Sequence, residues 1–217
     1  MKFYFLFVCF LSTVIPMFAQ EEMPASPAQS PVTPAQQEQT LFTRAKLRGG
    51  WIGSSFSNSK VGDYNGYGAG GSLGLVFNSF SVGLYGQGES FDGFQRDNRN
   101  YAFTMGHGGL YLGYSYPTKK ALHLMGSLKI GGGGVGMARR HHDWDWELEE
   151  EDFGDAIFVI LPEVGLELNV THWMRMSATA GYRVVNGFRG IPELNKNDLN
   201  APIFGLNFRF GWFGHKG

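Results

Sequence analysis

A strict alternation of large apolar residues with glycine or polar residues most constrains the fold of this chain. It is clearest over residues 204–212 (FGLNFRFGW), where every even-numbered residue is Phe, Leu or Trp and every odd-numbered one is Gly, Asn or Arg. Successive side chains of a β-strand point to opposite faces, so this pattern predicts a strand with one apolar and one polar face. In a soluble sandwich the apolar face would be the core, whereas in a membrane barrel it would face lipid.

The same alternation predicts seven further strands and is sharp over residues 163–170 and 174–183. After the first residues, no stretch approaches the length of apolar sequence that a membrane-spanning helix needs. In a membrane the chain must therefore form a closed barrel, because only helices and closed barrels satisfy every backbone hydrogen bond in hydrocarbon. The predicted strands cover residues 42–56, 64–77, 79–91, 101–116, 121–137, 156–170, 173–185 and 202–213.

The predicted connections alternate strictly between short and long. Outer-membrane barrels have short periplasmic turns, long extracellular loops and both chain ends in the periplasm. We therefore predict an all-β fold, an eight-stranded antiparallel up-and-down transmembrane barrel in a Gram-negative outer membrane. Tight joins are expected at residues 78–79, 117–120 and 171–172, and longer polar joins at 57–63, 92–100, 138–155 and 186–201.

Composition agrees with a barrel. The chain has 32 glycines in 217 residues, about twice the usual share of ~7%, without a Gly-X-Y period. The net charge of −1 gives no indication of a nucleic-acid partner. Aromatic residues gather toward both ends of the predicted strands, as in interfacial girdles. One girdle is expected from Phe77, Phe80, Tyr114, Tyr116, Trp173, Phe210 and Trp212, and the other from Trp51, Tyr67, Phe158 and Phe204.

Two segments are expected to precede the barrel, which is assigned to residues 41–213. Residues 1–19 match a signal peptide, with a charged start at Lys2, an apolar run and cleavage after Ala19. Residues 20–40 are rich in Pro, Gln and Ala and are expected to form a disordered periplasmic leader. Residues 214–217 form a short tail. The only cysteine, Cys9, lies in the signal segment, so no disulfide or cysteine metal site is predicted.

Four strings resemble a family of small outer-membrane barrels common in Bacteroidetes-type genomes and mostly of unassigned function. They are LYLGYS (110–115), KIGGGGVG (129–136), residues 158–185 and LNFRFGWF (206–213). In architecture the chain is also similar to the OmpA transmembrane domain and OmpX. The resemblance implies the fold and the location, and it brings no catalytic residue.

The inward face of the predicted barrel is charged. Eight strands leave an interior that side chains just fill, so these residues are expected to form a salt-bridged plug, in which Glu167 lies directly opposite Arg175. His107 and His123 are expected to point inward as ordinary interior histidines. The predicted lumen network comprises Arg44, Lys46, Arg48, Glu89, Lys129, Glu163, Glu167, Arg175, Arg183 and Arg209.

Two glycine motifs match a dinucleotide-binding fingerprint, at residues 66–71 and 131–136. That fingerprint needs a helix opening at the glycines, and neither motif precedes a helical pattern. We interpret these glycines instead as room for curvature and bulky neighbours in a small barrel.

The segment 139–155 is the most unusual predicted loop, with eight acids and two tryptophans, Trp144 and Trp146. Exposed Trp beside charge suits binding to another molecule, so the two tryptophans are candidate interaction residues. A divalent cation is a weaker alternative, because the spacing matches no calcium motif, and no metal or cofactor is predicted. The ligands would be His141, His142, Asp143 and Asp145.

These patterns favour a non-enzymatic envelope protein with a structural and loop-display role. The alternatives are a lipid A-modifying barrel enzyme, whose nucleophile and base would have to be within reach of lipid, and a narrow channel. The expected partners are outer-membrane lipid and lipopolysaccharide, the barrel-assembly machinery and an extracellular molecule. The barrel is expected to be a monomer.

Overall fold

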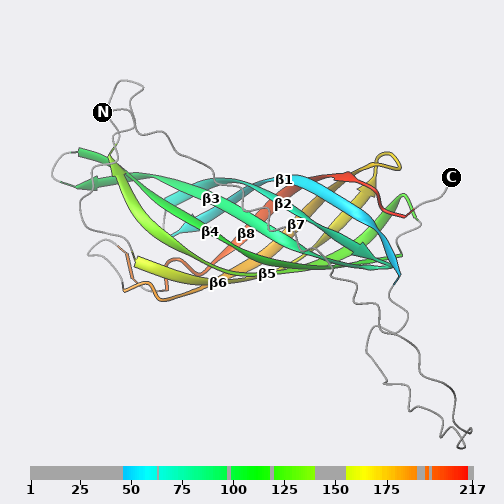
Figure 1. Ribbon diagram of the computed structural model, residues 1–217. Helices are drawn as coiled ribbons and strands as arrows, with labels where there is room; N and C mark the ends of the chain where they lie inside the picture. The colour runs from blue at the N-terminus through cyan, green and yellow to red at the C-terminus, as the bar shows by residue number, and fades with distance from the viewer. Residues whose placement is uncertain are drawn as a thin grey trace, which may run out of the picture. The chain divides into compact units, whose positions relative to one another are not determined.

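The computed structural model describes residues 46–62, 64–96, 99–117, 120–139, 155–189, 194–195 and 197–214. In these ranges eight antiparallel strands form one closed barrel, with each strand beside its neighbours in sequence and β1 paired with β8 (Figure 1). This confirms the predicted barrel fold. The strands are β1 (Leu47–Val61), β2 (Tyr64–Phe77), β3 (Phe80–Arg96), β4 (Arg99–Tyr116), β5 (Leu122–Arg139), β6 (Asp155–Asn169), β7 (Met174–Asn186) and β8 (Ala201–Gly211).

The two ends of the barrel carry different connections. Trp51 of β1 pairs with Gly211 of β8, so the start of β1 and the end of β8 lie at one end. We call this the turn end, and it also carries the connections 78–79, 117–121 and 170–173. The opposite end, here the loop end, carries the connections 62–63, 97–98, 140–154 and 187–200. The residues that the structure describes contain no helix long and apolar enough to cross a membrane.

The predicted strict alternation of connection lengths is wrong. Residues 57–61 and 92–96 are strand, and the β1–β2 and β3–β4 hairpins pair as far as Val61 with Tyr64 and Arg96 with Arg99. Only two of the four loop-end connections are therefore long. Backbone pairing does not require apolar side chains, so a polar run continues a strand when its inward side chains find partners. The inward Ser57 and Ser59 do so, because they bond to the side chains of Gln87 and Glu89.

The outward face of the barrel is apolar on all eight strands. Val164 and Leu166 are 69% and 50% exposed, as their alternation predicts, while their neighbours Glu163 and Glu167 are buried. The alternation also holds through β4, where Phe103, Met105 and His107 are all buried. The pairing of β3 with β4 shifts at residues 92–94 of β3. The exposed apolar residues include Ile52, Phe56, Leu73, Leu75, Val82, Leu84, Leu110, Leu112, Leu124, Phe158, Val164, Leu166, Tyr182, Phe204 and Leu206.

Most of the predicted girdle residues are exposed. Phe80, Tyr114, Tyr116, Trp173 and Trp212 are exposed near the turn end. Tyr67, Phe158 and Phe204 are exposed farther toward the loop end. Trp51 is the exception, because it is buried inside the barrel close to the turn end. Its predicted outer position rested on a strand ending at residue 56, and the true strand continues to Val61.

Several predictions fall outside the described residues. These are the signal peptide, the leader, Arg44, the final residues 215–217 and the loop residues Trp144, Trp146, His141, His142, Asp143 and Asp145.

Candidate functional site

The barrel interior contains three groups of charged side chains, and the first surrounds Glu167 near the turn end. Arg175 Nη1 donates to Glu167 Oε1 over 3.0 Å, and Arg209 forms a second ion pair with the same carboxylate. His123 Nε2 lies 2.8 Å from Glu167 Oε1. All four side chains are buried, which joins the ends of β5, β6, β7 and β8 through one carboxylate.

The register around Glu167 differs from the prediction. Arg175 lies opposite Asn169, and Glu167 lies opposite Ser177. Val170 N donates to Met174 O, so the hairpin closes through the three residues 171–173 instead of the two expected. The observed partner of Arg175 is two residues beyond the predicted one. The arginine side chain is long enough to reach Glu167 from the shifted position.

The second group lies midway along the barrel. Lys129 Nζ is 3.1 Å from Glu163 Oε2, and Ser127 Oγ donates to the same oxygen over 2.8 Å. The Lys129 ammonium also lies 5.9 Å from the centre of the Tyr85 ring. Both partners of the ion pair are buried, so Lys129 neutralises the Glu163 carboxylate inside the barrel.

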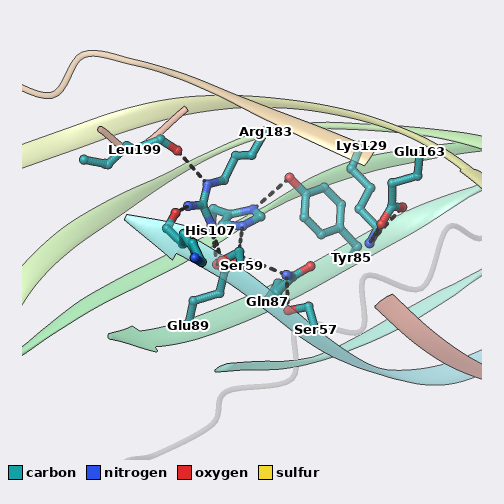
Figure 2. Close-up of polar contacts among 11 residues, drawn as sticks. Ser57, Ser59, Tyr85, Gln87, Glu89, His107, Lys129, Glu163, Arg183 and Leu199 are labelled. Atoms are coloured by element: carbon teal, nitrogen blue, oxygen red, sulfur yellow. Dashed lines mark hydrogen bonds and ion pairs between the residues drawn. The ribbon is translucent and has the colours of Figure 1, made fainter. Parts of the chain in front are cut away.

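The third group, around Glu89, lies toward the loop end (Figure 2). The carboxylate pairs with the fully buried Arg183 and accepts a hydrogen bond from Ser59 Oγ over 2.7 Å. Gln87 Nε2 donates to the other carboxylate oxygen over 3.1 Å. Arg183 Nε donates to the carbonyl oxygen of Leu199 over 2.9 Å, which ties the β7–β8 connection to the barrel interior.

An apolar cluster fills the interior at the loop end. It includes inward residues of β1 and β3 to β8, and three residues of the β7–β8 connection pack with them: Phe188, Leu194 and Leu199. Leu199 is completely buried. The predicted polar plug is therefore correct only for part of the interior. The cluster comprises Val61, Phe91, Phe103, Met105, Val135, Ile157, Val159, Leu161, Val185, Phe188, Leu194, Leu199 and Ile203.

Two residues predicted for the lumen network lie elsewhere. Lys46 and Arg48 are exposed, and Arg48 Nε donates to Asn78 Oδ1 at the rim of the turn end. The inward residues of β1 have odd numbers, as Trp51 and Ser59 show, so the parity of this strand directs Arg48 outward. The prediction had Trp51 facing outward and therefore assigned the two faces of β1 the wrong way round. The other seven predicted residues that the structure describes are buried inside the barrel.

The glycine motifs lie inside strands β2 and β5, so no helix opens at either of them. Several of these glycines make room for neighbours, as interpreted from the sequence. A Cβ at Gly66 would collide with the Phe91 ring, and a Cβ at Gly131 or Gly133 would collide with the backbone of β4.

Sequence reasoning missed the polar residues that complete the three groups. Ser59, Gln87 and Ser127 each bond to a buried carboxylate. Their inward parity was available as a signal, but serine and glutamine occur equally in loops. The Glu89 group includes Ser59 and His107, and the Glu167 group includes Ser115 and His123. Each group thus brings serine, histidine and carboxylate side chains together. Both groups are buried inside the barrel, away from its exposed apolar face. No cluster of three metal-ligating residues occurs among the residues that the structure describes.

No family model matches the chain, and no curated protein does. Among solved structures the chain is similar to Neisserial surface protein A, with a TM-score of 0.51 and 9% identity over 74% of this chain and 96% of that one. It is also similar to the outer membrane protein OprG of Pseudomonas aeruginosa, with a TM-score of 0.49 and 12% identity over 77% and 98% of the two chains. At such identities the likeness shows the fold alone, that of small eight-stranded barrels. The architectural resemblance to OmpA and OmpX is confirmed at this level, and membership in a Bacteroidetes-type family stays a prediction.

Proposed function

We propose that this chain is a non-enzymatic outer-membrane protein, in which the barrel anchors and supports the segments at its loop end. The observation that carries the proposal is the distribution of side chains across the wall. Large apolar residues are exposed on every strand, while seven charged residues of strands β3 and β5 to β8 are buried inside: Glu89, Lys129, Glu163, Glu167, Arg175, Arg183 and Arg209. An exposed apolar surface of this extent indicates contact with a membrane or with another protein. A closed barrel can lie in lipid because it has no open sheet edge with unsatisfied backbone groups.

The interior supports an anchoring role over the two alternatives. An apolar cluster fills the loop end, and ion pairs together with a second cluster of buried residues fill the remainder, which is the opposite of a water-filled passage. The second cluster comprises Trp51, Val76, Tyr85, Tyr111 and Phe213. The interior serine and histidine side chains are enclosed, whereas an enzyme acting on lipid needs its nucleophile where lipid can reach it. Neither observation favours a channel or a lipid A-modifying enzyme.

In the proposed orientation the turn end faces the periplasm and the loop end faces outward. The acidic segment 139–155, with Trp144 and Trp146, would then meet an extracellular partner. Outer-membrane lipid and lipopolysaccharide would surround the apolar band, and the barrel-assembly machinery would insert the chain as a monomer. This arrangement follows the usual one for such barrels, with long connections outside and short turns inside.

The first test is the gel mobility of the protein in isolated outer membranes, with and without boiling. We expect the unboiled protein to resist SDS and to migrate differently from the boiled one. Identical mobility, together with recovery in the soluble periplasm, would contradict the proposal and point to a secreted β-protein.

The loop-display role needs a separate test. Replacing Trp144 and Trp146 by alanine should leave the mobility shift intact and should reduce binding of cells to the partner molecule. A matched control replaces Trp173, an exposed tryptophan at the turn end, by alanine. Loss of the folded band in the Trp144 and Trp146 variant would show that these residues support folding instead of display.

A further inference from the structure

A small cavity lies inside the barrel between the Glu167 group and the Lys129–Glu163 pair. Its volume is about 20 Å³, enough for one particle of the size of water. The polar residues that line it include Trp51, Lys129, Glu163, Ser177, Asn207 and Arg209. All eight strands contribute to its lining, through inward side chains and through Gly71 and Gly86.

Two of the lining residues carry buried polar atoms without a hydrogen-bond partner among the described residues. They are Trp51 Nε1 and Ser177 Oγ, and both residues are at least nine-tenths buried. An indole N–H can only donate, and a hydroxyl can donate or accept. Buried polar groups in proteins are nearly always satisfied, so these two indicate an occupant that accepts hydrogen bonds.

The charge inside the barrel favours an anion as that occupant. The buried ionic side chains in the described ranges are four cations, Lys129, Arg175, Arg183 and Arg209, and three carboxylates, Glu89, Glu163 and Glu167. Counted without the two interior histidines, these side chains leave one positive charge in excess. Glu167 pairs with both Arg175 and Arg209, and Arg209 also lines the cavity. An uncompensated buried charge is costly, so a counter-ion beside Arg209 would stabilise the barrel.

We propose that this cavity binds one small monovalent anion of the size of chloride. Trp51 Nε1 and Ser177 Oγ donate hydrogen bonds to the ion, and the Arg209 guanidinium supplies the compensating charge. Glu163 is the carboxylate that lines the same cavity, and it is neutralised by Lys129 at 3.1 Å. The small volume excludes polyatomic anions such as gluconate. The proposal does not depend on the membrane location or on the role of the loops.

The solution test compares refolded barrel in detergent with sodium chloride or with sodium gluconate at equal ionic strength. We expect the temperature at which the folded gel band disappears to be higher in chloride. The Trp51→Phe variant keeps an aromatic ring but lacks the N–H, so it should lose this chloride-dependent difference. The Trp173→Phe variant, altered at an exposed site, should keep it. Equal stability of the wild-type barrel in both salts, or a full difference in Trp51→Phe, would overturn the proposal.

A second test covers the case in which Trp51→Phe does not fold. Ser177→Ala removes the other donor and should reduce the chloride-dependent difference. Crystals of the unaltered protein grown with bromide should show an anomalous peak in the cavity within hydrogen-bond distance of Trp51 Nε1. A cavity that holds a water molecule only, with no bromide peak, would contradict anion binding.

Discussion

The same strands fill the barrel interior in two different ways at its two ends. Toward the turn end, β6, β7 and β8 place Glu167, Arg175 and Arg209 inside, and these side chains neutralise one another. Toward the loop end, the inward residues of the same three strands are aliphatic and belong to the apolar cluster. Strand parity thus decides which side chains point inward, while the nature of the filling changes along each strand.

The difference follows from what closes each end. At the loop end, Phe188, Leu194 and Leu199 of the β7–β8 connection are buried against the strand residues of the interior. This covering excludes water and makes an apolar filling favourable. At the turn end the connections are short, and Arg175 stacks on Phe213 at 4.0 Å beside the rim. The charged side chains there are buried and pair with one another.

Arg183 and Glu89 are the exception, because they form an ion pair next to the apolar cluster. Both side chains are fully buried, and the Arg183 guanidinium lies 5.5 Å from the centre of the Phe91 ring. An ion pair in such surroundings depends on both partners, since either one alone would be an uncompensated charge.

The largest expected effect is therefore from Arg183→Met. We expect it to lower the free energy of unfolding by about 3–5 kcal/mol, because the Glu89 carboxylate loses its cation. Urea unfolding in lipid vesicles measures the change. The double variant with Glu89→Gln should recover a large part of the loss, because the buried charge is then removed. No recovery would mean that Arg183 acts mainly through its contact with Leu199.

Removal of apolar filling comes next. Leu161→Ala in the fully buried cluster should destabilise the barrel by about 2–5 kcal/mol, the usual range for a buried leucine. Leu166→Ala on the same strand is the matched control, since Leu166 faces outward and is half exposed. Urea unfolding of the two variants under one condition separates the contributions. Equal losses would contradict the assignment of the loop-end interior as a packed core.

The corresponding change at the turn end should cost less. Arg175→Met removes one of two arginines from Glu167, and Arg209 remains to neutralise the carboxylate. We expect a loss of about 1.5 kcal/mol, typical of one hydrogen bond to a charged group. Urea unfolding measures this loss as well. A loss as large as that of Arg183→Met would show that the carboxylates at the two ends depend equally on a single arginine.

Much of the fold could be predicted from the sequence because the strands alternate so clearly. The outward positions of Val164 and Leu166 and the inward position of Arg209 follow from parity alone. Parity misleads where the face of one residue in a strand is assigned wrongly, as it is for Arg48. With Trp51 taken as an outward girdle residue, the even-numbered residues of β1 are placed inside, whereas Trp51 is buried and Ile52 is exposed.

The candidate site was less predictable than the wall. Sequence identifies Glu167 and Arg175 as inward residues, but their pairing depends on the length of one turn. The cavity beside Arg209 depends on how residues of all eight strands pack together, and alternation contains no such information. The burial of Leu194 and Leu199 was also missed, because two leucines in a polar connection have no periodicity.

The smallest expected effect concerns the Lys129–Glu163 pair, which lies between the two kinds of filling. Replacing both partners, with Lys129→Met and Glu163→Gln, removes two opposite charges and keeps similar side-chain volumes. The introduced amide oxygen can still accept from Ser127 Oγ, which now donates to the carboxylate over 2.8 Å. Replacing a buried ion pair by well-packed neutral groups often changes stability little, so we expect the free energy of unfolding to change by no more than about 1 kcal/mol.

Lys129→Met alone should cost more, because Glu163 then keeps its charge without a cation. If urea unfolding shows instead that the double variant is as unstable as the single one, then the pair contributes a specific geometry that neutral filling cannot replace. The barrel would then depend on charged side chains at this position, and apolar side chains like those of the loop end could not replace them.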